Sequence, residues 1–164
     1  MMNSEVAAIL RRIADLMELQ KGDQFKIRSY RTAADSITGL QTPLSELAAR
    51  GGAAELRKLP GIGDAISKRI VDLLETGTTE VYEQLRAVIS ETVLDLLQIG
   101  GVGMKTLEVL HHQFKVRSLD DFAKFVAGGG LESVPRLGEK TRARIRAALT
   151  KRGYQIDVPG DATS

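Results

Sequence analysis

Leu59-Pro60-Gly61-Ile62-Gly63 joins two segments of helical periodicity through a tight turn, and this turn decides how the rest of the sequence is organised. The pattern is apolar-x-Gly-apolar-Gly. Two glycines this close together let the backbone take positive φ angles and approach a partner without an intervening Cβ. A helix that begins directly after them presents its free amides and the positive end of its dipole outward. The segment therefore predicts a turn that holds a phosphate oxygen.

The same pattern returns as Ile99-Gly100-Gly101-Val102-Gly103 and, in weaker form, as Val134-Pro135-Arg136-Leu137-Gly138. The final glycines stand at positions 63, 103 and 138, so the copies lie 40 and 35 residues apart. This unequal spacing indicates repeated motifs inside one fold rather than an open solenoid. Three turns of phosphate size indicate a nucleic-acid backbone as the partner.

Charge is distributed unevenly along the chain. The formal net charge of the 164 residues is only +2, so a local basic patch has to meet any anionic partner. Between Arg136 and Arg152 there are seven basic residues and one acidic residue, whereas between Asp72 and Gln98 there are six acidic residues and one basic residue. The C-terminal run therefore predicts a basic face, although a merely solvated helix face is the alternative.

Composition excludes several classes of function. The absence of cysteine excludes disulfides and thiolate chemistry, and 4% aromatic residues argue against a base-stacking platform for single strands. No apolar run approaches the roughly 20 residues that span a bilayer. We expect a cytoplasmic protein without a membrane partner, associated with the nucleoid if the source is bacterial.

Apolar residues at three- and four-residue spacings predict an all-α fold of about ten helices. Thr42-Pro43 predicts the start of a short helix, and Gly51-Gly52 predicts a break after it. Only Tyr154 to Val158 alternates as a strand would, and it is short. The expected helices cover residues 4–19, 24–40, 43–50, 53–58, 64–75, 79–88, 90–97, 104–114, 119–126 and 139–151, and residues 131–134 lead into the third turn.

Three blocks together carry a family resemblance: Phe25-Lys26-Ile27-Arg28-Ser29-Tyr30-Arg31-Thr32-Ala33-Ala34, the first glycine turn, and the second glycine turn with Met104-Lys105-Thr106. They resemble the N-terminal lyase domain and the fingers helix-hairpin-helix region of X-family (beta-like) DNA polymerases, without the palm domain. The resemblance implies a helix-hairpin-helix bundle of two small subdomains. Residues 1–77 would be lyase-domain-like with the first hairpin, residues 78–152 fingers-like with the second and third, and residues 153–164 a polar tail.

The resemblance also implies how the chain holds DNA. Residues aligned with Lys26, Tyr30 and Arg57 hold a 5′-phosphate at a gap, although Tyr30 is equally well explained as a core ring. Hairpin carbonyls, here of Arg57, Leu59 and Ile62 and of Leu97, Ile99 and Val102, would hold K⁺ or Na⁺; no cofactor is otherwise required. The predicted phosphate-binding residues are Lys26, Tyr30, Arg31, Arg57, Gly61, Gly63, Ala65, Lys68, Arg69, Gly101, Gly103, Lys105, Thr106, Gly138, Lys140 and Thr141.

The sequence departs from the family where catalysis is concerned. It contains neither the Asp-x-Asp pair nor the Gly-Ser pair of the palm, and two-metal phosphoryl transfer needs clustered carboxylates. The lyase lysine of the family aligns with Arg69, whose guanidinium does not deprotonate and so forms no imine. Lys68 is the alternative nucleophile, and its side chain lies about 100° from that of Arg69 around the helix axis.

The sequence therefore predicts a protein that binds the DNA backbone at gaps, nicks or 5′-phosphate ends during repair, independently of base sequence and without polymerase activity. One alternative is a weak deoxyribose-phosphate or abasic-site lyase that uses Lys68. The other is an interaction module whose acidic segment from Asp72 to Gln98 docks a basic repair protein. Two substitutions affect the turns: Gly100 replaces a common proline, and Arg136 replaces a glycine and adds a charge.

Overall fold

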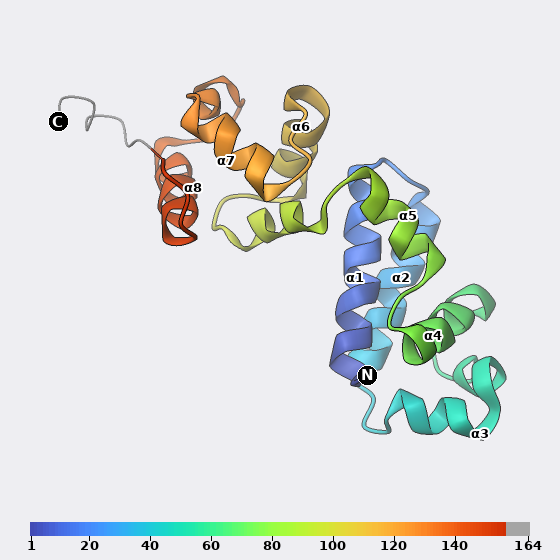
Figure 1. Ribbon diagram of the computed structural model, residues 1–164. Coiled ribbons are helices and arrows are strands. Elements are labelled where there is room, and N and C mark those ends of the chain that lie inside the picture. The colour runs from blue at the N-terminus through green and yellow to red at the C-terminus, as the bar shows by residue number, and fades with distance from the viewer. Residues whose placement is uncertain (157–164) are drawn as a thin grey trace. The chain divides into compact units, whose positions relative to one another are not determined.

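The computed structural model describes residues 1–156, and every regular element within that range is helical (Figure 1). Eight α-helices and two 3₁₀ helices follow one another in these residues, which confirms the expected all-α fold. The chain divides into two units, Met1–Val88 and Ile89–Ser164.

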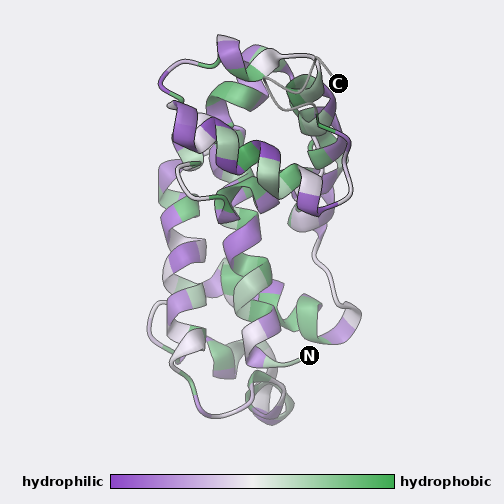
Figure 2. Ribbon diagram, turned by 90° about the vertical axis from the view of Figure 1, so that its left-hand side faces the viewer, coloured by the Kyte–Doolittle hydropathy of each residue, from purple (hydrophilic) through white to green (hydrophobic). Residues whose placement is uncertain are grey.

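The first unit packs two helical pairs on one apolar core. Helix α1 contacts α2 and α5, while α4 contacts α2 and α3. Each helix turns its apolar stripe inward, so hydrophobic and hydrophilic residues alternate around the ribbons in Figure 2. The helices are α1 (Asn3–Leu19), α2 (Gln24–Thr38), α3 (Leu44–Leu56), α4 (Asp64–Thr76) and α5 (Glu80–Val88).

The start of α3 is capped from a distant part of the chain. Asn3 on α1 accepts a hydrogen bond from the Leu44 amide (2.8 Å) and donates one to the Thr42 carbonyl (2.9 Å). Pro43 occupies the N-cap position, one residue later than the sequence indicates, because Asn3 supplies the capping oxygen. Gly51 and Gly52 have non-helical backbone angles inside α3, which confirms the expected break.

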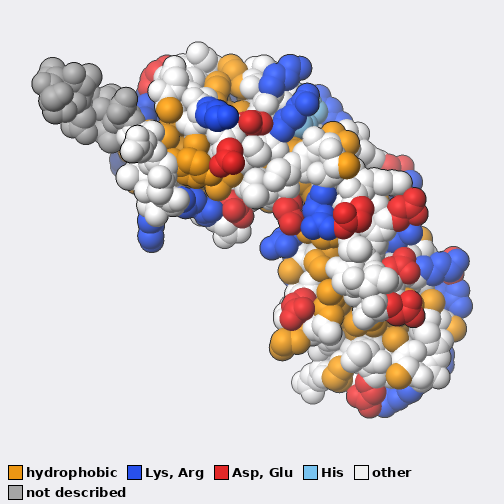
Figure 3. All heavy atoms as spheres, viewed as in Figure 1, with side chains coloured by type: hydrophobic (Ala, Val, Ile, Leu, Met, Phe, Trp, Pro, Cys, Tyr) orange, Lys and Arg blue, Asp and Glu red, His pale blue; other side chains and the backbone are white. Residues whose placement is uncertain are grey.

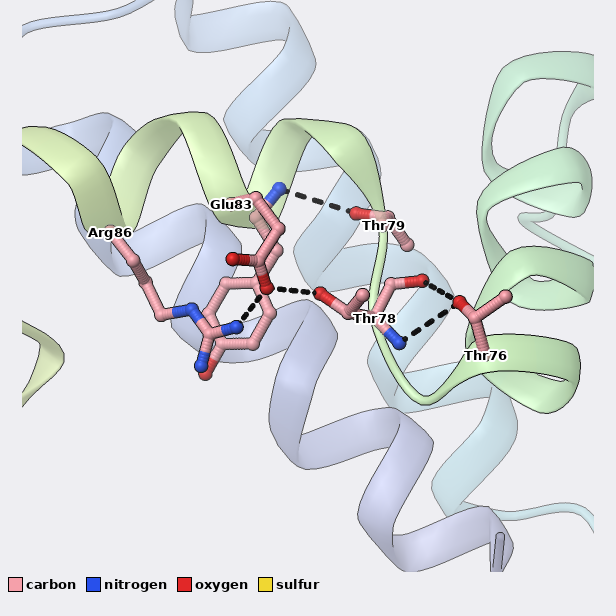
Figure 4. Close-up of polar contacts among 6 residues, drawn as sticks. Thr76, Thr78, Thr79, Glu83 and Arg86 are labelled. Carbon is pink, nitrogen blue, oxygen red and sulfur yellow. Dashed lines mark hydrogen bonds and ion pairs between the residues drawn. The ribbon is translucent and has the colours of Figure 1, made fainter.

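A polar network joins α4 to α5 (Figure 4). The Thr76 hydroxyl donates to the Thr78 carbonyl (3.0 Å), and the Thr78 hydroxyl donates to Glu83 (2.6 Å), which also pairs with Arg86. The Thr78 hydrogen bond, followed by Arg86, lowers the pKa of Glu83. Because α5 is held by this network and packs on α1, the division between the units falls after Val88 instead of after residue 77.

The second unit is built on a smaller core around Phe122, with α7 in contact with both 3₁₀ helices. The segment expected as a helix over residues 90–97 is a 3₁₀ helix, and the Ser90 side chain caps it. The elements are η1 (Glu91–Gln98), α6 (Met104–Phe114), α7 (Leu119–Ala127), η2 (Gly130–Ser133) and α8 (Glu139–Lys151).

The chain beyond α8 is tied back onto the second unit. Arg152 pairs with Asp95 on η1 (3.1 Å), and the Tyr154 hydroxyl donates to Asp120 on α7. This hydrogen bond raises the pKa of Tyr154. Residues 154–156 form no strand, while the rest of the alternating segment and most of the expected tail lie outside the described residues.

Within residues 1–156 no helix is both long and apolar enough to cross a membrane.

Candidate nucleic-acid interface

The three glycine turns have the same backbone conformation at their third position. Gly61 has φ +78° and Gly101 has φ +92°, and Arg136, which replaces the glycine in the third copy, has φ +64°. Each turn also buries its fourth residue, and these residues are Ile62, Val102 and Leu137. The arginine therefore accepts a left-handed conformation that L-residues seldom adopt, and the third copy keeps the turn.

Equivalent hydrogen bonds enter and leave each turn. On the entry side, the amides of Leu59, Ile99 and Val134 donate to the carbonyls of Leu56, Leu96 and Leu131 at 3.1–3.2 Å. On the exit side, the amides of Ser67, Leu107 and Arg142 donate to the carbonyls of Gly63, Gly103 and Gly138 at 3.0 Å. The sequence motif thus produces three copies of one hairpin geometry, in which a tight turn joins two helical segments.

The helices that follow these turns begin without a side-chain cap. Gly63, Gly103 and Gly138 are the N-cap residues of α4, α6 and α8, and a Cβ at any of them would meet nothing within 4 Å. By contrast, side-chain oxygens of Asp23 and Ser118 cap α2 and α7. The first amides of the three hairpin helices therefore remain open to an anion.

Close packing explains the glycines at the third position. A Cβ at Gly61 would lie 2.8 Å from the Thr32 methyl carbon, and a Cβ at Gly101 would lie 2.5 Å from the Thr141 hydroxyl oxygen. Thr141 belongs to the first turn of α8, so the second turn packs directly against the third hairpin. Its contact with Gly101 gives Thr141 a structural role besides its predicted place near phosphate.

In the first hairpin an acidic side chain occupies the helix N-terminus. Asp64, the first residue of α4, pairs with Arg57 (2.5 Å) and Lys68 (3.3 Å). The hydrogen bond from Arg57, followed by that from Lys68, lowers the pKa of Asp64. Two of the predicted phosphate-binding cations are thus partly neutralised. The sequence signal for this was the acid directly after Gly63, since the first turn of a helix favours acids.

Of the residues expected to hold a 5′-phosphate, Lys26 and Tyr30 lie on α2, and Arg57 follows the end of α3. Lys26 is exposed in the first turn, whereas the Tyr30 ring is only 6% exposed and belongs to the core. Arg31 pairs with Asp15 (2.9 Å) and Glu18 (2.8 Å) and so ties α2 to α1. Of the predicted cations on α2, Lys26 is therefore the one with its charge at the surface.

Arg69, at the lyase position, the alternative nucleophile Lys68 and the predicted phosphate-binding Ala65 lie on α4. Ala65 is exposed, and Arg69 is half-buried, with no hydrogen-bond partner for its Nε among the described residues. Lys68 is exposed and paired with Asp64, whereas an imine-forming lysine works as a neutral, desolvated amine. The geometry thus offers no activated lysine at the lyase position.

The second hairpin carries no acid in the equivalent place. Met104 is the first residue of α6, and the exposed Lys105 follows it. No carboxylate in the described part of the chain forms an ion pair with Lys105, and Thr106 is half-buried beside it. The positive end of α6 is therefore reinforced by a lysine where α4 is neutralised by an aspartate.

The basic run of the C-terminal region separates into two faces of α8. Arg142 (3.3 Å) and Arg146 (3.0 Å) both pair with Glu132 on η2. Lys140, Arg144 and Lys151 pair with no carboxylate of residues 1–156, and they lie within about 40° of one another at 100° per residue. We call these three residues the α8 stripe. Lys and Arg side chains over α8 are visible in Figure 3. Alternate cations of the run therefore have different roles. Arg142 and Arg146 form ion pairs within the unit, and Lys140 and Arg144 remain at the surface.

Two of the carbonyls predicted to hold a monovalent cation accept hydrogen bonds within the turns. Those of Leu59 and Ile99 each accept one backbone hydrogen bond, from Ile62 and Val102, and a carbonyl oxygen has a second acceptor position. No group of three or more His, Asp or Glu side chains within the described residues is arranged to bind a metal ion.

Two family models match this chain. A helix-hairpin-helix domain model matches residues 1–79, and a SAM-like helix-hairpin-helix tandem model matches residues 93–151. The first match contains the first turn, and the second match contains both remaining turns. The expected hairpins are thereby confirmed, and these domains indicate DNA binding.

Among curated proteins, the chain is 24% identical to DNA polymerase/3′-5′ exonuclease PolX of Bacillus subtilis (strain 168) over 94% of its own length. It is 28% identical to DNA polymerase lambda of Rattus norvegicus and 29% identical to DNA-directed DNA/RNA polymerase mu of Homo sapiens, each over 62% of its length. The chain covers only 26%, 16% and 19% of these three proteins. It is therefore built from helix-hairpin-helix domains and is homologous to part of the X-family DNA polymerases.

Proposed function

We propose that this chain binds the sugar-phosphate backbone of DNA without reading base sequence, at gaps, nicks or 5′-phosphate ends in DNA repair, and that it catalyses no polymerisation. The observation that carries the proposal is the set of three uncapped helix N-termini that follow identical turns. Backbone amides contact phosphates, which position a protein on DNA but carry no sequence information.

The preference for a 5′-phosphate rests on the first unit. Lys26 is exposed one helical turn before Tyr30, and Arg69 on α4 is a half-buried cation. A terminal phosphate carries more charge than an internal one and presents more acceptor oxygens, so a lysine and a guanidinium favour it. A K⁺ or Na⁺ on the carbonyls of Leu59 and Ile99 would add positive charge where the turn meets DNA.

The two other functions predicted from the sequence receive less support. Lys68 pairs with Asp64, so the lyase has no neutral amine in place. The acidic segment is divided between the two units after Val88, and its residues Glu83 and Asp95 are paired with Arg86 and Arg152. These pairs give no support to a single acidic docking surface on this segment.

The proposal is tested with a gapped duplex carrying or lacking the 5′-phosphate, at low salt. Contact with about five phosphates would give a slope of log K against log salt of about −4.5. Lys26→Ala should remove the preference for the phosphorylated gap, while Arg28→Ala, an exposed control on another face of α2, should retain it. Equal affinity of the wild type for both gaps would refute the 5′-phosphate preference, and absence of DNA binding would refute the whole proposal.

A further inference from the structure

A groove of about 550 Å³ lies beside the second hairpin, between its backbone and α8. Ile99 and Gly100 of the turn form one side, and Arg144, Lys151 and Arg152 contribute charged side chains. The groove does not include the open amides of α6, which follow Gly103. It is therefore a feature separate from the hairpin N-terminus.

Glycine at position 100 lets the guanidinium lie against the turn. A Cβ there would be 3.3 Å from Arg144 Nη1 and 3.8 Å from its Cδ. The first and third turns have Pro60 and Pro135 at this position. The close approach of an arginine to the turn is thus a feature of the second hairpin's own sequence.

The charge of the groove suits one phosphate. Arg152 is paired with Asp95, so the two groups cancel, while Arg144 and Lys151 belong to the α8 stripe and have no ion-pair partner in residues 1–156. A planar guanidinium matches two phosphate oxygens, and an ammonium acts as a point charge beside it.

We infer that this groove is a second phosphate subsite, which takes a backbone phosphate of the same DNA that the amides of α6 bind; this rests on the proposed function. Gly100 and Gly103 are three residues apart, at most about 11 Å along the chain. One strand of a duplex carries a phosphate every 3.4 Å or so of helix axis. The groove and the helix N-terminus therefore meet phosphates a few positions apart.

The test compares two variants that lose the same charge. Arg144→Ala/Lys151→Ala removes the two free cations of the groove, and Lys115→Ala/Lys124→Ala removes two exposed lysines elsewhere on the second unit. Binding of an unphosphorylated duplex is measured as a function of salt, with circular dichroism to check the fold. The groove variant should bind about tenfold more weakly and have a salt slope about one unit shallower, and the control should keep the wild-type slope.

An equal slope for the groove variant and the control would overturn the subsite while leaving the proposed function intact. If the wild type bound no duplex, both proposals would fail. Gly100→Leu gives an independent check, because it fills the groove without changing charge and without requiring a positive φ. It should also flatten the slope by about one unit, and an unchanged slope in this variant would count against the subsite.

Discussion

The first and second hairpins share one backbone geometry but differ in the charge that surrounds it. In the first, Asp64 stands at the start of α4 and draws Arg57 and Lys68 onto itself. In the second, Met104 and Lys105 occupy the start of α6, and Arg144 lies against the turn. We therefore expect turn shape alone not to determine phosphate affinity. We expect the second hairpin to be the stronger anchor on unphosphorylated duplex.

The largest effect is expected from Gly101→Ala. Alanine at φ +92° is strained, and its Cβ would lie 2.5 Å from the Thr141 hydroxyl, so the turn has to shift. Loss of the amide contacts to one phosphate should weaken duplex binding about thirtyfold. Gly61→Ala has a similar φ, but its Cβ meets the exposed Thr32, which can move aside. This substitution should weaken duplex binding only about threefold. Fluorescence anisotropy with a labelled duplex measures both.

Circular dichroism of both alanine variants should show a helix content like that of the wild type, since the strain is confined to a turn. A greater loss from Gly61→Ala than from Gly101→Ala would reverse the proposed order of the hairpins.

A smaller difference is expected between Lys105→Ala and Lys68→Ala. Lys105 has its charge free beside the α6 N-terminus, so its removal should weaken binding about tenfold and flatten the salt slope by about one unit. Lys68 is already paired with Asp64, and its removal should change affinity less than about twofold. Salt titrations of both variants give the result, and similar losses would mean that the Asp64 pair does not withhold Lys68 from DNA.

The fold and the turns follow closely from the sequence. Periodic apolar residues define the helices, and the two glycines define each turn, because both signals are local. The third turn shows that the conformation also forms without the first glycine, because Arg136 adopts the left-handed conformation there. The buried Leu137 and the hydrogen bonds on both sides of the turn impose that conformation.

The ion pairs of the site could not be predicted in the same way. The pairs of Arg31 with Asp15 and Glu18 and of Arg152 with Asp95 connect residues far apart in the sequence, so only the tertiary structure reveals them. The capping of α3 by Asn3 has the same origin. The spacing of four and seven residues in the α8 stripe does correspond to one helix face, although we interpret the sequence alone as one undivided basic run.

Asp64→Asn should make the first hairpin more like the second. The amide keeps the size of the side chain but releases Arg57 and Lys68 and removes a negative charge from the approach of a phosphate. We expect binding of 5′-phosphorylated gapped DNA to tighten about threefold to fivefold, as loss of a like charge at an exposed site allows. Glu46→Gln, which breaks the exposed pair with Arg50 on α3, is the charge-matched control. A gain of the same size in that control would show that the change in net charge alone causes the tighter binding.

The smallest effect concerns stability in acid. Because its pairs with Arg57 and Lys68 lower the folded-state pKa of Asp64 below 3.8, ionised Asp64 stabilises the fold above that pH. This stabilisation is lost as the pH falls through the lowered pKa. Wild type should therefore melt on the order of one to two °C above Asp64→Asn near neutral pH, with the difference vanishing in strong acid and in high salt. A difference in Tm that stayed constant through the acid range would show that the pairs in the first hairpin do not hold the carboxylate ionised, and the contrast with the second hairpin would lose its electrostatic basis.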